Sequence, residues 1–153
     1  MHDQLLETWR IHNRINLYLL ESIPDEALEA VAASKGRNVA EQFAHIHKVR
    51  LMWLKASAPE SVEGSIELPK GDPLDKPLLS RALTHSAEQI ETMLLEGLRM
   101  NRIKNFKPHP TAFLGYIISH ESHHRGQIMM TLKEAGFPAD KKTGYGIWEW
   151  GAR

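Results

Sequence analysis

Histidine is the residue type with which this chain is best equipped for chemistry. The 153-residue sequence contains nine histidines and no cysteine, which excludes disulfides, cysteine-type zinc sites and thiol nucleophiles from the chain itself. His120 and His124 form the most informative pair, because residues four apart on a helix lie only about 40° apart around its axis. Apolar residues at helical spacing share that stripe (Phe113, Ile117 and Ile128). We therefore expect both imidazoles to point into a helical core.

Two inward imidazoles need partners for their ring nitrogens. An unpaired buried polar group costs about 1–3 kcal/mol. A metal ion meets this need well, because histidines at positions i and i+4 present two nitrogens one helical turn apart. The alternative without a metal requires carboxylates such as Glu41 or Glu121, or buried water, to satisfy the same rings.

A third ligand has to come from another helix. His45 and His47 are the nearest candidates, and because they differ by about 200° around a helix, only one of them can face the site. Periodicity does not choose between them. His12 and Asn16 share an apolar helix face and are candidates for a ligand, a partner of a ligand or a hydrogen-bonded core group. His123 points away from the central stripe, so we expect it to flank the site.

The segment 120–124 also matches H-E-x-x-H, the zinc-peptidase signature in which the glutamate, here Glu121, acts as general base. The extended signature asks for glycine and histidine downstream, where this chain has Gln127 and Met130. Glu149 is a distant candidate for the third ligand. Because no segment predicts a strand that would hold an extended peptide, a zinc peptidase remains a lesser alternative.

The elements that position these residues are predicted to be helices. Apolar residues recur at helical spacing in four long segments, and no segment shows sustained two-residue alternation. These segments run over about 3–22, 38–57, 75–100 and from just after Pro110 to about 135, with Thr111 as the expected cap of the last. Four amphipathic helices predict an all-α fold, a four-helix bundle, within one domain over 1–153.

The connection between the second and third helices, 58–74, is long and contains three prolines, two glycines and four acidic residues. Such a connection either crosses the bundle from end to end or overhangs a site. Near the C-terminus, Tyr145, Trp148 and Trp150 are expected to pack on the core or on a partner subunit.

Charge and hydropathy exclude several function classes. Lys plus Arg and Asp plus Glu both number 19, so the formal charge is zero and the positive field that attracts nucleic acid is missing. The longest apolar stretch, 112–118, is far shorter than the ~20 residues of a membrane span, and no signal peptide is evident. Because cysteine is absent, we expect a cytoplasmic protein. Because the positive field and a membrane span are both missing, we expect it to bind neither nucleic acid nor membrane.

Three parts of the sequence resemble the DinB superfamily, in the same order along the chain. They are His45-Ile46 with Trp53 eight residues on, then HESHHRGQI at 120–128, then LKEAGFP at 132–138. The resemblance implies a four-helix bundle that forms a homodimer, with a divalent metal held by His45, His120 and His124. It thus selects His45 over His47. It also suggests that Gly126 permits close helix packing and that Gln127 reaches the edge of the site.

Relatives in this superfamily include thiol-dependent S-transferases, so the resemblance implies a low-molecular-weight thiol as a second cofactor. Three neutral imidazoles leave metal positions open for water or substrate, as in catalytic sites. The sequence therefore predicts a metal-dependent enzyme, with zinc or nickel the expected ion, that activates a thiol or water against a small electrophilic substrate. The main alternative is a non-catalytic, metal-stabilised binding or stress-response module.

Overall fold

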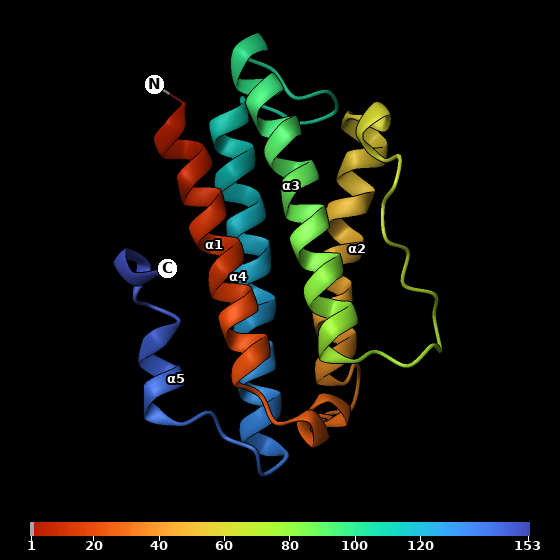
Figure 1. The fold of residues 1–153 in the computed structure, drawn as a ribbon, viewed down its shortest axis with the longest axis vertical. Helices are drawn as coiled ribbons and strands as arrows, with labels where there is room; N and C mark the ends of the chain where they lie inside the picture. Colours follow the sequence, from red (N-terminus) through yellow and green to blue (C-terminus); the bar gives the residue numbers. More distant parts are fainter. Residues whose placement is uncertain (1) are drawn as a thin grey trace.

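The computed structural model describes residues 2–153, which contain four long helices, several short ones and no β-strand (Figure 1). The all-α prediction is confirmed. No helix among these residues combines the length and apolar character needed to cross a lipid bilayer. The long helices are α1 (Asp3–Ser22), α2 (Val39–Ser57), α3 (Lys76–Met100) and α4 (Pro110–Glu134).

Side-chain caps fix the start of α2 and α3. Asn38 accepts a hydrogen bond from the backbone N–H of Glu41 at 2.8 Å, and the Glu41 carboxylate accepts one from the Asn38 N–H at 2.9 Å. This reciprocal capping box satisfies two amides that a helix leaves without partners. At the start of α3, Asp75 accepts from the Leu78 N–H at 2.8 Å. Both starts agree with the predicted boundaries.

The cap of α4 differs from the prediction. The expected cap, Thr111, lies inside the helix, and the ring Nδ1 of His109 instead accepts a hydrogen bond from the Ala112 N–H at 3.1 Å. The reason is Pro110, which occupies the first helical position, where a missing N–H costs nothing and the fixed φ suits a helix. The capping residue therefore falls one place before the proline.

The four helices form a bundle in which α1 and α2 each pack against both α3 and α4. In Figure 1, α1 and α4 run in one direction along the bundle, and α2 and α3 run in the other. Because α2 and α3 are parallel, the chain between them has to return along the whole bundle. The connection that follows α2 does so on the outside (yellow to green in Figure 1), which decides between the two predictions for it.

The bundle core has two apolar parts separated by a polar layer. One part includes Leu19, Phe43, Leu83 and Ile128. The other includes Trp9, Leu54, Ile90 and Phe113. Between them along every long helix lie buried polar residues, with 0–7% of each exposed: His12, Asn13, Asn16, His47, Arg50, Ser86, Glu121, His124 and Arg125. We call these residues the polar layer.

The C-terminal segment, which contains α5 (Lys141–Gly146), lies beside α1 (Figure 1). Trp150 packs against the apolar core as predicted. Tyr145 and Trp148 do not, because 72% and 73% of their surfaces are exposed. Within one chain, the prediction for the aromatic tail is therefore confirmed for Trp150 alone.

Candidate metal centre

Three histidines meet where α2 packs against α4. One ring nitrogen from each of His45, His120 and His124 lies within 4.8 Å of the others. Nε2 of His120 is 3.2 Å from Nε2 of His124. The ring centroid of His45 is 4.5 Å from that of His124 and 5.7 Å from that of His120. His45 and His120 are half-buried, so the cluster lies at the edge of the core and not at its centre.

This donor set fits a divalent transition metal. Zinc–nitrogen bonds of about 2.0–2.1 Å place two ligand nitrogens no more than about 4 Å apart, a range that the His120–His124 pair already meets. Nδ1 of both rings is buried without a hydrogen-bond partner. Imidazole nitrogens suit zinc, nickel, copper and iron. A metal held by these three residues would tie α2 to α4.

Without a metal, carboxylates such as Glu41 or Glu121 would have to hydrogen-bond to the clustered imidazoles, and neither does. Glu41 is engaged in the capping box of α2. Glu121 hydrogen-bonds to His12, Asn16 and Arg50 and to none of the three clustered rings. The clustered imidazoles therefore have mainly one another as polar neighbours.

The electrostatic surroundings keep the cluster uncharged. Burial, followed by the nearby rings of His45 and His120, lowers the pKa of His124 to about 4. Burial is also the main cause that lowers the pKa of His45 and the pKa of His120. All three imidazoles are consequently neutral at pH 7, which is the form that coordinates metals.

The remaining histidines near the cluster have other positions. His47 faces the opposite side of α2, where its Nε2 lies 2.6 Å from the backbone oxygen of Ile66 in the long connection. Periodicity left open which of His45 and His47 faces the site, and the structure places His45 with His120 and His124. His123 is exposed, with its ring centroid 5.1 Å from that of His124, and it flanks the cluster as predicted.

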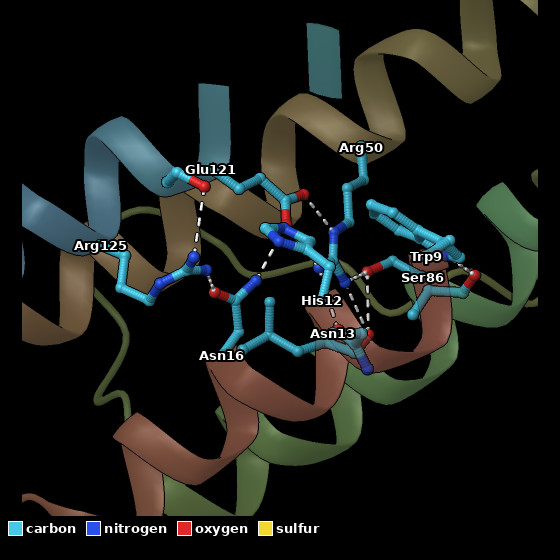
Figure 2. A network of polar contacts seen from close by, with 11 residues as sticks. Trp9, His12, Asn13, Asn16, Arg50, Ser86, Glu121 and Arg125 are labelled. Carbon is cyan, nitrogen blue, oxygen red and sulfur yellow. Dashed lines mark hydrogen bonds and ion pairs between the residues drawn. The ribbon is translucent and has the colours of Figure 1, made fainter. Parts of the chain in front are cut away.

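His12 and Asn16 are hydrogen-bonded core groups. Nε2 of His12 lies 2.8 Å from a carboxylate oxygen of Glu121, and the Asn16 side-chain amide donates to the same oxygen at 2.9 Å (Figure 2). The Asn16 side-chain oxygen accepts from Arg125 at 2.7 Å. Of the three roles considered for these residues, the structure shows the third, since these side chains are engaged with Glu121 and Arg125 and, among residues 2–153, no hydrogen bond joins them to the three clustered rings.

Glu121 lies at the centre of the polar layer. Arg50 donates to one of its carboxylate oxygens at 2.6 Å and to the other at 2.8 Å, and also donates to Asn13 and to the backbone oxygen of Leu83 (Figure 2). Burial raises the pKa of Glu121, but the charge and hydrogen bonds of Arg50, with a smaller contribution from His12, outweigh it and lower the pKa to about 2. Glu121 is therefore an ionised, fully engaged structural group.

This position of Glu121 bears on the peptidase alternative. A general base needs a free carboxylate oxygen within reach of a proton to abstract. Both oxygens of Glu121 are occupied by partners from α1 and α2, and the side chain is 1% exposed. Glu149, the distant candidate ligand, is not part of the histidine cluster. The geometry thus gives the H-E-x-x-H peptidase no support, although the letters of the motif are present.

Two further expectations concern α4. Gly126 was expected to permit close helix packing, but it is exposed, and a side chain at this position would meet no atom within 4 Å. That prediction is wrong, because the helix turns this residue away from its neighbours. The side chain of Gln127 lies near enough to His124 to act on the pKa of that ring, so it does reach the edge of the cluster.

Comparisons with known proteins agree with this architecture. A family model described as the DinB family matches residues 1–144. The crystal structure of a DinB-like protein, YjoA from Bacillus subtilis, superposes with a TM-score of 0.62 at 18% identity, covering 87% of this chain and 92% of that one. At this identity the likeness concerns the fold alone. A search of curated proteins finds no match.

Proposed function

The chain belongs to the DinB family, and on that premise we propose that it is a divalent-metal-dependent enzyme whose site is formed by His45, His120 and His124. The observation that carries the proposal is the convergence of three neutral imidazoles from two helices, with ring nitrogens within 4.8 Å of one another. Zinc and nickel are the ions we propose, because both accept imidazole nitrogen.

The cluster is suited to catalysis more than to a purely structural role. Structural zinc sites are closed by four protein ligands, whereas catalytic sites have three and leave a position open. Among residues 2–153, no fourth histidine or carboxylate joins the group of three. When bound, the metal would supply Lewis acidity that lowers the pKa of a coordinated thiol or water.

The reaction we propose is transfer of a low-molecular-weight thiol to a small electrophile, with hydrolysis by water as the variant. The thiol loses its proton to solvent, its sulfur bonds to the electrophilic carbon, and the leaving group departs with the bonding electron pair. The thiol has to be supplied from outside, because this chain has no cysteine. His45, His120 and His124 hold the site, and the buried Arg50–Glu121 ion pair links the same two helices, α2 and α4.

The test compares metal-loaded and metal-free protein, purified without a histidine tag. Each is mixed with a panel of small thiols and a bimane electrophile, and product formation is followed by fluorescence. We expect turnover only with metal, its loss in His124→Ala, and its retention in the neighbouring control His123→Ala. Rates no greater than those without protein would favour the non-catalytic module, in which the metal raises Tm but no product forms.

A further inference from the structure

A cavity of about 710 Å³ opens beside the histidine cluster, between the segment 32–37 and α4. Its lining includes Lys35 and Arg37 on one side and His123, Gln127 and Glu134 on the other. Small-molecule sites commonly have volumes of roughly 300–1,000 Å³. The cavity is therefore large enough for a metabolite-sized molecule.

The three clustered histidines do not line the cavity themselves, but residues next to them on α4 do. Gln127 lines it and follows His124 by three residues on α4, so the two side chains share a face of the helix. His123 also lines it, and its ring centroid is 5.1 Å from that of His124. On the opposite wall, Arg37 directly precedes Asn38, the cap of α2, which is the helix that carries His45. A molecule in the cavity would thus lie next to the proposed metal position.

The charge of the cavity wall is positive, although the whole chain is neutral. Lys35 and Arg37 are exposed, and neither forms an ion pair within the part of the chain that the structure describes. Glu134 is the one carboxylate in the lining, and it accepts a hydrogen bond from the Ala33 N–H at 2.9 Å. The two cations are therefore available to an anionic ligand.

The segment that carries the cations has a defined shape. The N–H of Lys35 donates to the backbone oxygen of Ala32 at 2.8 Å, which closes a turn. Lys35 and Gly36 have left-handed φ values of 66° and 98°. The bond from Ala33 to Glu134 attaches this turn to α4. The cations are thus held by a built turn at the mouth of the cavity, directly before the cap of α2.

From these observations we infer that the cavity binds the carboxylate arm of the small molecule that reacts at the three histidines, with Arg37 as its principal contact. This inference rests on the proposed function, because the reacting end of the molecule is placed at the cluster. A guanidinium can donate two parallel hydrogen bonds to one carboxylate. The substrate class is then a thiol or similar metal-binding group joined to a carboxylate by a short chain.

The experiment uses untagged protein loaded with Co²⁺, because binding of a thiolate to cobalt gives an absorption band that does not depend on turnover. The probes are 4-mercaptobutyrate and 4-mercapto-1-butanol, which have the same chain and differ in carboxylate against hydroxyl. We expect the carboxylate thiol to bind roughly tenfold more tightly or better. In Arg37→Ala the two thiols should bind equally.

A matched control distinguishes direct contact between the carboxylate and Arg37 from long-range attraction of the carboxylate to any nearby positive charge. Lys48 is also exposed and lies on α2 three residues after His45, but it does not line the cavity. Lys48→Ala should keep the preference for the carboxylate thiol. Equal binding of both thiols by wild type, a preference that survives in Arg37→Ala, or an equal loss in Lys48→Ala would each overturn the inference.

A second measurement keeps the cavity testable if the proposed function fails. If neither thiol produces a cobalt band, thiol activation at the cluster is wrong, and the cavity is tested with butyrate and metal-free protein. The side-chain amide signals of Gln127 in NMR spectra should then shift saturably in wild type and not in Arg37→Ala. Unchanged signals in wild type would overturn the carboxylate site itself.

Discussion

Arg50 of α2 donates to both carboxylate oxygens of Glu121 of α4, at 2.6 and 2.8 Å, in the middle of the bundle. Arg50 is 0% exposed and Glu121 is 1% exposed, so the pair is fully removed from solvent. Glu121 follows the clustered His120 directly in sequence. The ion pair therefore fixes the same two helices that bring the three histidines together.

Removing the charge of Glu121 should destabilise the fold strongly. In Glu121→Gln, Arg50 keeps its buried charge without a counter-ion, which typically costs about 3–5 kcal/mol. Urea denaturation of metal-free protein at pH 7 measures the change in the free energy of unfolding. Glu7→Gln is the matched control, because Glu7 pairs with Arg14 at the surface and an exposed pair contributes less than about 1 kcal/mol. Equal losses in the two variants would contradict the account.

The same carboxylate predicts a pH dependence. The pKa of Glu121 falls from an ordinary value of 4.5 to about 2 in the folded protein. Since a lowered carboxylate pKa stabilises the charged folded form, its contribution is complete above about pH 4.5 and is lost as the pH falls toward 2. The free energy of unfolding, measured by urea at pH 5 to 2.5, should fall more steeply in wild type than in Glu121→Gln. Parallel curves would refute this.

His47 is predicted to anchor the long connection and to have no part in metal binding. Its Nε2 lies 2.6 Å from the backbone oxygen of Ile66. In His47→Ala, amide hydrogen exchange should become faster in the segment 62–72, because the connection loses this attachment to α2. Metal affinity should stay within twofold of wild type. A loss of metal as large as that in His45→Ala would show that the two histidines were assigned wrongly.

The exposed aromatic tail predicts self-association, and we propose that the protein forms a homodimer through it. Tyr145 and Trp148 leave 72% and 73% of their surfaces uncovered within one chain. Trp148→Ser should shift sedimentation toward the monomer. Met100→Ser serves as a control, because Met100 is also 73% exposed but lies at the C-terminal end of α3 and not in the aromatic tail. A monomeric wild type at about 100 μM would argue against the proposal.

Much of the fold could be predicted from local signals. Apolar spacing and capping residues gave the four helices to within about two residues, since each signal lies within a few residues of the element it controls. The error at α4 arose because Thr111 is a good capping residue by type, while Pro110 fixed the cap at His109. The helix itself was therefore predicted correctly, and only its capping residue was wrong, because the position of Pro110 was not taken into account.

The site could be predicted only in part. The spacing of His120 and His124 showed that they share a face. The choice of His45 depended on the family resemblance, because His45 and His47 lie at similar angles on opposite sides of the apolar stripe of α2, and periodicity favours neither. The Arg50–Glu121 pair was missed, although Arg50 lies one helical turn after Ile46 on the apolar face of α2. A charge on an apolar stripe was the available signal. Its partner lies 71 positions away, and such a distance is not readable from periodicity.

The cavity beside the cluster could not be foreseen from the sequence. It depends on a left-handed turn at Lys35 and Gly36 and on the contact between Ala33 and Glu134, which are far apart in the chain.

The central claim, that His45, His120 and His124 bind one metal ion, is tested most directly by calorimetric titration of untagged, metal-free protein with Zn²⁺ and Ni²⁺. The account predicts one ion per chain for wild type and for His123→Ala, and at least about a hundredfold weaker binding for His120→Ala. If His120→Ala binds either ion as tightly as wild type, the three-histidine metal centre is contradicted.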